Sequence, residues 1–447
     1  ACRLSGSRGQ RCLLRFFFSM KTGNRQLSMD LGDSISMEKI NVLHLADIHI
    51  GMENYGRLDS RSGLNSRVLD FLRRMSEAID FALENGADIC IFAGDAYKNQ
   101  RPNPTLQREF ARRIKRLTDA DIPTLLLVGN HDMSTADRAA SSLDIFKTLD
   151  VPGVIVANRE ELHQLTCRRG QKVQVACAPY PQRSRLLSDD EYRNMSIEEL
   201  DRALINIVGD NIAGLAKEAQ ENEDTPTIFI GHFSVSEAKQ GSEQSVMIGR
   251  DVVIQRSFLA DPVWDYVALG HIHKHQELND GYHPPIVYPG SLERIDFGEE
   301  REPKGFVWAQ VEKGRSSWEF MEVKSRKFLT IRIDVSESDD PMTDVLDKID
   351  EYEVTDAIVR IIIRAREEQD PLIEDRLIQQ ALREASYVAG ISHDIDRHHR
   401  RRLGETNIEE LSPLMALELY FETKNLDEDR KETLLNHAEA LIQKPQP

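Results

Sequence analysis

The chain has 447 residues and a formal net charge of −18, and this length is typical of about three domains. Hydrophobic residues make up 40% of it and charged residues 30%, a composition typical of a globular protein with a sizeable core. No apolar run approaches the ~20 residues that cross a bilayer, so the sequence predicts no membrane-spanning helix and no membrane partner. The negative charge argues against coating nucleic acid by bulk charge, although it allows a local basic groove or a carboxylate-rich metal site.

The cysteines indicate a reducing compartment. The chain has five of them, and no two form a Cys-x-x-Cys pair; they are Cys2, Cys12, Cys90, Cys167 and Cys177. This pattern argues against a disulfide scaffold and against a cysteine-based zinc site. The sequence therefore predicts a cytoplasmic protein.

The first 36 residues differ in composition from the rest. The first 29 contain six basic residues and no acid, and the chain opens without methionine. One interpretation is an Arg-rich transit peptide. The favoured one is upstream sequence translated ahead of a start at Met20, Met29 or Met37, because Met37 lies just before the first predicted strand. Residues 1–36 are therefore predicted to be a disordered or non-native extension.

From Asn41 onward, short apolar runs alternate with helical patterns, which indicates an α/β sandwich. Helical patterns cover 67–84, 105–118 and a polar stretch within 188–223. The runs are rich in branched residues and bounded by Gly, Asp or His, as buried strands are. They are 42–46, 89–93, 124–128, 227–230 and 266–269.

Side chains that can bind metal ions follow each of these five strands. In open α/β sheets the carboxyl ends of the strands form the ligand crevice, and glycine there lets the backbone approach a ligand closely. A spacing of two, as in Asp47-x-His49, puts both side chains on one side of an extended segment. The five segments are Asp47-x-His49, Gly94-Asp95, Gly129-Asn130-His131-Asp132, Gly231-His232 and Gly270-His271-x-His273.

The ligand types predict a two-metal centre. Carboxylate, amide and imidazole without thiolate suit Mn²⁺, with Mg²⁺, Fe²⁺ or Zn²⁺ as alternatives. Two ions about 3.5–4 Å apart can activate a water and stabilise both oxygens of a phosphoryl displacement. A single Gly-Asp or Gly-His is usually only a turn, but five in this order argue against coincidence. Seven ligands suit two ions that share one carboxylate: Asp47, His49, Asp95, Asn130, His232, His271 and His273.

This order of motifs is similar to that of the calcineurin-like metallophosphoesterases. Two longer stretches resemble the SbcD family, the nuclease subunits of bacterial SbcCD complexes. They are Gly129–Asp132 followed by Leu143-Asp144-Ile145-Phe146, and Tyr288-Pro289-Gly290-Ser291-Leu292-Glu293-Arg294-Ile295-Asp296-Phe297-Gly298-Glu299-Glu300. The resemblance covers residues 38–322 well and the remainder more loosely. It implies a phosphoesterase nuclease domain at 37–325.

The resemblance also implies roles for individual residues. Asp47, His49 and His273 would hold the first metal, and Asn130, His232 and His271 the second. Asp95 would bridge them. His131 would stabilise the transition state or give a proton to the leaving oxygen, with Asp132 as its orienting partner. The chain departs from several relatives at Lys98, where they carry a histidine implicated in exonuclease action, so the balance of exonuclease and endonuclease action stays open.

The remaining segments carry the partner predictions. A small α/β module, predicted as strands 328–335, 357–364 and 387–391 and helices 342–349 and 371–384, would be a DNA-binding capping domain at 326–395. Residues 396–447 combine the basic loop His398–Arg402 with helices at 408–421 and 427–442. By resemblance these helices would bind the coiled coil of an SbcC-type ATPase. Lys98, Arg183 and Arg185 are further DNA-contact candidates, and relatives form homodimers within a heterotetramer.

The sequence thus predicts a two-metal DNA phosphodiesterase of repair, recombination and replication. By resemblance it would degrade duplex ends 3′ to 5′ and nick single strands or hairpins. The alternative enzyme is a general phosphatase or cyclic-nucleotide phosphodiesterase with the same metal core. A metal-free scaffold would require a missing ligand, and none of the seven is missing.

Overall fold

The computed structural model describes residues 39–133, 140–183, 186, 192, 195–239, 241, 251–396, 413–422 and 428–442. The predicted extension at 1–36, Arg185 and the basic loop at 398–402 lie outside these residues. None of the helices in these ranges is long and apolar enough to cross a membrane.

The first of two large sheets has six strands in the order β14-β13-β1-β2-β3-β4. β1 to β4 run parallel, and β13 and β14 extend the sheet as antiparallel strands. The parallel strands are short and almost wholly apolar because both faces of this part of the sheet are covered. Their bounds are β1 Ile40–Leu45, β2 Ile89–Phe92, β3 Thr124–Leu127, β4 Val154–Ala157, β13 Gly305–Glu312 and β14 Arg315–Glu322.

The second large sheet also has six strands, in the order β11-β12-β10-β7-β6-β5. Its centre, β12-β10-β7-β6, is parallel, and an antiparallel strand closes each edge. A separate two-stranded pair joins β8 (Ser234–Val235) to β9 (Val253–Ile254). The bounds are β5 Glu161–Thr166, β6 Lys172–Ala178, β7 Thr227–His232, β10 Tyr266–Gly270, β11 Gln276–Glu277 and β12 Ile286–Tyr288.

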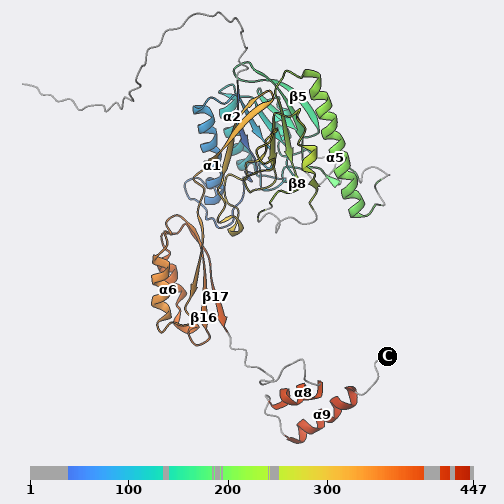
Figure 1. Cartoon of the computed structure of the whole chain (residues 1–447). Helices are drawn as coiled ribbons and strands as arrows, with labels where there is room; N and C mark the ends of the chain where they lie inside the picture. The colour runs from blue at the N-terminus through green and yellow to red at the C-terminus, as the bar shows by residue number, and fades with distance from the viewer. Residues whose placement is uncertain are drawn as a thin grey trace, which may run out of the picture. The chain divides into compact units, whose positions relative to one another are not determined.

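The two sheets face each other across one apolar layer, which includes Val42 and Ile89 from the first sheet and Val175 and Ile228 from the second. Helices cover both outer faces (Figure 1). α1 (Ser66–Glu84), α2 (Pro104–Thr118) and the short α3 (Asp144–Thr148) lie on the first sheet, and α5 (Ile197–Ala219) lies on the second. The predicted α/β sandwich is therefore confirmed.

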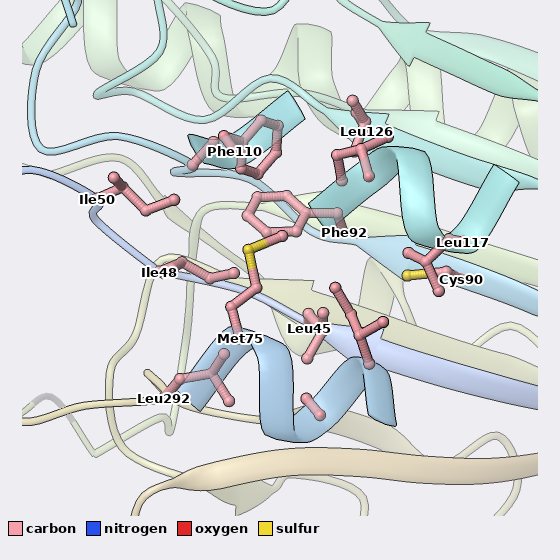
Figure 2. Packing of buried hydrophobic residues seen from close by; sticks show 14 of the residues in the cluster. Leu45, Ile48, Ile50, Met75, Cys90, Phe92, Phe110, Leu117, Leu126 and Leu292 are labelled. Carbon is pink, nitrogen blue, oxygen red and sulfur yellow. The ribbon is translucent and has the colours of Figure 1, made fainter. Parts of the chain in front are cut away.

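The outer layer on the first sheet fixes where the ligand-bearing loops begin. Met75 of α1 and Phe110 of α2 pack around Phe92 at the end of β2 (Figure 2). Ile48 and Ile50, which flank His49 in sequence, point into the same cluster and are fully buried. Their burial anchors the loop after β1 on both sides of His49.

α5 begins later than its sequence pattern suggests. The polar pattern covered 188–223, whereas the helix starts at Ile197. Ser196 and Glu199 form a reciprocal capping box, in which each side chain accepts from the other's backbone N–H. This device satisfies two backbone donors at the helix start and sets the boundary there.

A small three-stranded parallel sheet follows the sandwich. β15 (Phe328–Asp334), β16 (Ile358–Arg366) and β17 (Tyr387–Asp396) pair in chain order. α6 (Pro341–Asp350) and α7 (Asp375–Ala381) cover one face. The helix predicted at 371–384 is instead the 3₁₀ turn η5 (Asp370–Leu372) followed by the shorter α7, because Ile373 after the turn is extended.

Two helices stand near the end of the chain. They are α8 (Pro413–Glu422) and α9 (Glu428–Ile442), and they contact each other. Met415 and Tyr420 of α8 are exposed, and so is Leu434 of α9. Where the structure describes them, both helices agree with the predicted positions to within one residue at each end, and residues 408–412 at the predicted start of the first helix lie outside the described residues.

Candidate metal centre

The seven predicted ligands meet where the carboxyl ends of the two large sheets come together. Three segments follow β1, β2 and β3 of the first sheet, and two follow or end β7 and β10 of the second. The carboxyl ends of parallel strands are the usual position of a ligand site. Six of the seven side chains are buried and Asn130 is half-buried.

The backbone at four of these residues is in the left-handed region. The φ angles are 52° at Asp47, 50° at His49, 58° at Asp95 and 97° at His271. Such a conformation costs a non-glycine residue of the order of 1–3 kcal/mol and often clusters at functional sites, although turns also contain it, as at Asp121. Backbone hydrogen bonds hold it here, from Asp47 N–H to Gly94 (3.0 Å) and from His49 N–H to Asp95 (3.1 Å).

Two of the glycines are required by the close approach of ligand side chains. Gly94 has φ +97°, and a Cβ there would lie 2.2 Å from His232 Nδ1. A Cβ at Gly129 would lie 2.2 Å from an oxygen of Asp95. These contacts explain physically why glycine accompanies the ligands in the sequence motifs.

Asp47, His49 and His273 form a first cluster of ligand atoms, all within 4.8 Å of one another. The Nε2 atoms of His49 and His273 lie 3.0 Å apart. Two ligands bound to one ion at ~2.1 Å, at right angles, would be separated by about 3 Å. The pair is thus spaced for a shared cation.

Asn130, His232 and His271 form a second cluster. Asn130 Oδ1 lies 3.1 Å from His232 Nε2 and 3.1 Å from His271 Nδ1. Asp95 reaches both clusters, because its Oδ2 is 3.3 Å from His232 Nε2 and 3.8 Å from His49 Nε2. The geometry therefore fits two divalent cations that share the Asp95 carboxylate, and the donor set of oxygen and imidazole nitrogen suits hard or borderline ions.

The electrostatics of the site also favour positive charge. Burial would lower the pKa of His232, but the carboxylates of Asp95 and Asp47 raise it to about 9. Burial opposes ionisation of Asp95, yet the neighbouring His232 and His131 hold its pKa below the ordinary value. At His49 burial prevails and lowers the pKa well below the ordinary value, so its imidazole is neutral and offers a lone pair.

Each of three ligand imidazoles has its second nitrogen bonded to an acceptor behind it. His273 Nδ1 donates to Glu299 (2.9 Å), His271 Nε2 to Asp251 (3.0 Å), and His232 Nδ1 to the Ala93 carbonyl (2.6 Å). These bonds place the lone pair of the other nitrogen toward the centre. Such partners fix the tautomer and the ring orientation of metal ligands.

The sequence-based prediction missed both carboxylates in that set. Glu299 lies within the stretch from Tyr288 to Glu300 that carries the family resemblance, so a signal for it existed. Asp251 lies next to no recognised motif, and no local signal marks it. The charge of Lys304 and the hydrogen bond from His273 outweigh burial and lower the pKa of Glu299 below its ordinary value.

His131 lies beside the centre, but its partner differs from the predicted one. Its ring stands edge-on to His49 with centroids 4.9 Å apart, and its Nδ1 donates to the Lys98 carbonyl (2.8 Å). Asp132 does not orient it. The buried Asp132 carboxylate accepts from the backbone N–H groups of Asp95 and Ala96, at 2.9 and 3.1 Å.

Of the three predicted DNA contacts, two are described. Lys98 is half-buried beside His131. Arg183 forms an ion pair with Asp201 of α5, which offsets part of its charge. Arg185 lies outside the described residues.

We expect the metal-depleted chain to gain thermal stability from Mn²⁺, because a ligand that binds only the folded state stabilises it. At 100 times the dissociation constant the gain is about 2.7 kcal/mol for each site, which corresponds to roughly 5–10 °C in midpoint for a domain of this size. Differential scanning fluorimetry of chelator-treated protein measures it. His49→Ala should lose most of the shift, whereas His283→Ala, at an exposed histidine, should keep it. An unchanged wild-type midpoint would contradict the metal centre.

Comparisons with known proteins give many similar relatives, of which three are the following. The chain is 24% identical to the DNA double-strand break repair protein Mre11 of Haloferax volcanii, over 79% of this chain and 68% of that protein. It is 26% identical to Mre11 of Archaeoglobus fulgidus, over 65% and 61%. It is 26% identical to the SbcD subunit of the nuclease SbcCD of Escherichia coli K12, over 58% and 62%. The chain thus spans about two thirds of the length of these proteins.

The similarity to archaeal Mre11 and to bacterial SbcD is equally distant, so it does not single out the bacterial subunit that the motifs suggested. The profile of the calcineurin-like phosphoesterase family matches residues 40–275, which include the five ligand-bearing segments. Together with the sandwich and the converging Asp and His side chains, this match over more than half of the chain assigns a family. The chain belongs to the calcineurin-like phosphoesterases, the metal-dependent hydrolases of phosphate esters.

Proposed function

We propose that this chain is a two-metal DNA nuclease, the nuclease subunit of an SbcCD-type complex in DNA repair, recombination and replication. It would degrade duplex ends from 3′ to 5′ and cut single strands and hairpins. The observation that carries the proposal is the pair of ligand clusters joined by Asp95, with His131 half-buried beside them. Relatives named as double-strand break repair proteins and as a nuclease subunit support DNA as the substrate.

In the proposal the chain holds two divalent cations, with Mn²⁺ as the preferred one. When bound, such ions activate a water molecule and stabilise the negative charge that develops on the phosphate in the transition state. Asp47, His49 and His273 would hold the first. Asn130, His232 and His271 would hold the second, and Asp95 would bridge them.

His131 is the proposed proton donor to the leaving oxygen. The Lys98 carbonyl can only accept a hydrogen bond, so the bond of 2.8 Å places a proton on His131 Nδ1. Nε2 is then the nitrogen that can face a phosphate. A protonated ring would give its second proton from Nε2 to the oxygen of the departing strand. The same carbonyl fixes the ring orientation, a role that the sequence-based prediction gave to Asp132.

Lys98, Arg183 and Arg185 are the proposed contacts to the DNA backbone within residues 37–325. We further propose that the small sheet at 326–395 is a DNA-binding cap. A lysine beside the centre can contact a phosphate as a point charge, although it cannot easily relay protons near neutral pH.

The partner proposals rest on exposed apolar side chains. Met415 and Tyr420 of α8 and Leu434 of α9 are 53%, 40% and 39% exposed, which suits binding to the coiled coil of an SbcC-type ATPase. A groove of about 630 Å³ lies between α2 and α3, and Ile145 and Leu149 on its rim are exposed. We propose that this groove is the contact surface between two copies of the chain, which would form a homodimer within a heterotetramer. The proposed location is the cytoplasm.

The test is cleavage of DNA by the chain from Met37 onward. End-labelled linear duplex and hairpin DNA are incubated with Mn²⁺, with and without chelator, and His131→Ala controls for contaminating nuclease. We expect Mn²⁺-dependent cleavage that the variant lacks, and the fragment ladder gives the polarity. If DNA stays intact while a small phosphomonoester or cyclic nucleotide is hydrolysed rapidly, the nuclease proposal is wrong and the phosphatase or cyclic-nucleotide alternative holds.

A further inference from the structure

The 3₁₀ turn η4 (Phe297–Glu299) lies between a metal ligand and the small sheet. Glu299 faces the centre and is fully buried, whereas Phe297 and Glu300 on either side of it are half-buried. The turn is only three residues long and begins with the Asp296 carboxylate accepting from Gly298 N–H at 2.8 Å. A segment this short can transmit a displacement from one end to the other.

On the side of η4 that faces the metal centre, Glu299 and Lys304 hold His273 in place by hydrogen bonds. Glu299 Oε1 accepts from His273 Nδ1 at 2.9 Å, and its Oε2 is 3.0 Å from Lys304 Nζ and 2.9 Å from Ile295 N–H. Lys304 Nζ also donates to the His273 carbonyl at 3.1 Å. Glu299 and Lys304 are both essentially inaccessible to solvent. Ring and backbone of this ligand are therefore fixed by the same ion pair.

On the other side, the neighbours of Glu299 are bound to β15 and β16 of the small sheet. Glu300 accepts from the backbone N–H of Thr330 at 2.9 Å and from its hydroxyl at 2.6 Å. The Phe297 ring lies 5.0 Å from the Phe328 ring, and the Arg360 guanidinium carbon lies 4.2 Å from the Phe297 centroid. Arg360 Nη2 also donates to the Thr330 hydroxyl at 3.0 Å, which links these contacts.

We propose that η4 couples the small sheet to the metal centre, with Glu299 and Lys304 as positioning residues for His273 and with Phe297, Glu300 and Arg360 as their anchors. This inference rests on the proposed two-metal function. Whatever binds the small sheet would then change how His273 holds its metal. The physical reason is that the lone pair of an imidazole ligand must point toward the metal. The hydrogen bond to the other ring nitrogen fixes that orientation.

The test compares Mn²⁺ affinity among variants of the full chain by the EPR signal of free Mn²⁺. Glu299→Gln keeps the shape of the side chain but loses the charge that pairs with Lys304. We expect it to weaken one of two sites by about 10- to 100-fold. Arg360→Met removes the guanidinium from Phe297 and Thr330 without touching the centre. We expect it to weaken the same site by about 2- to 30-fold, the range of such indirect couplings.

Arg364→Met is the matched control. Arg364 lies four residues further along β16, on the same face of the strand as Arg360, and is exposed beside Asp334 at 3.8 Å. The affinity of the Arg364→Met variant for Mn²⁺ should equal that of the wild type. At saturating Mn²⁺ the thermal midpoint of Arg360→Met should rise by as much as that of the wild type, because the ligands themselves are intact. A general loss of folding would not give this rescue.

The outcomes separate this inference from the proposed function. Wild-type affinity in Arg360→Met and Glu300→Gln, with weakened binding in Glu299→Gln, would disprove the coupling to the small sheet. Unchanged affinity in Glu299→Gln would overturn the positioning role as well. A wild-type chain that binds two Mn²⁺ but leaves DNA intact would contradict the nuclease function. The affinity comparison would then still decide the inference.

Discussion

Asp95→Asn is expected to abolish Mn²⁺-dependent cleavage, with a loss of about 10³-fold or more. The proposed shared carboxylate supports both ions, and several kcal/mol of transition-state stabilisation depend on them. The fold should survive, since an asparagine oxygen can still accept from His131 N–H, as Asp95 Oδ1 does at 2.8 Å. Single-turnover cleavage and Mn²⁺ binding by EPR measure the two effects.

The same variant should respond differently to metal removal. Asp95 contributes to raising the pKa of the buried Asp132 carboxyl, which burial and Asp95 together bring to about 7. Neutralising Asp95 removes this repulsion, but it also removes the charge that raises the pKa of His232 to about 9. Because the pKa of Asp95 itself is held below its ordinary value, its charge stabilises the folded state on balance. The metal-free variant should therefore be less stable than the metal-free wild type, and it should gain little from Mn²⁺. Asp121→Asn is the matched control, because Asp121 also has a positive φ, of 56°, but is exposed in a turn. Full Mn²⁺ stabilisation of Asp95→Asn would show that this carboxylate is not the bridge.

His131→Ala is expected to lower the turnover of DNA by about 10²- to 10⁴-fold, the range for general acid catalysis, while two Mn²⁺ still bind. The reason is the bond from His131 Nδ1 to the Lys98 carbonyl, which leaves Nε2 to give a proton to the leaving oxygen. A diester with p-nitrophenolate as its leaving group should be far less affected, because that oxygen departs without a proton. Stopped assays on both substrates measure the difference.

The competing interpretation of His131 is that it binds a metal. A ring nitrogen of His131, a ring nitrogen of His49 and a carboxylate oxygen of Asp95 lie within 4.8 Å of one another, so a third cation cluster is geometrically available. Loss of one Mn²⁺ from His131→Ala, with both substrates affected equally, would support that role and rule out the proton donor. His283→Ala, at an exposed histidine, should leave both rates and the metal content unchanged.

Five parallel strands of the two large sheets could be predicted from sequence because their signals are local, whereas the parallel strands β4, β6 and β12 were not predicted. Buried parallel strands give uninterrupted apolar runs, and the predicted runs agree with β1, β2, β3, β7 and β10 to within about two residues. The antiparallel edge strands were not predicted. Most of β14 and the second half of β5 alternate between half-buried and exposed residues, and such strands resemble loops until a partner strand pairs with them.

The five segments that carry the seven candidate ligands could also be predicted, because each segment follows or ends its own strand. That they meet at one place depends on two sheets stacking with their carboxyl ends together. The pairing of His49 with His273, for example, joins residues 224 apart in the chain at 3.0 Å. The order of motifs was informative only through its resemblance to a family in which this stacking is known.

The sequence by itself determined five strands of the two large sheets, the residues at their ends and hence the type of chemistry, because backbone propensity and ligand chemistry belong to single segments. Only the tertiary structure decided which groups stand behind the ligands. It paired His271 with Asp251, His131 with the Lys98 carbonyl, and His273 with Glu299. Each of these contacts is a hydrogen bond between segments distant in sequence or between side chain and backbone. Such bonds depend on the relative placement of packed elements, which no local pattern encodes.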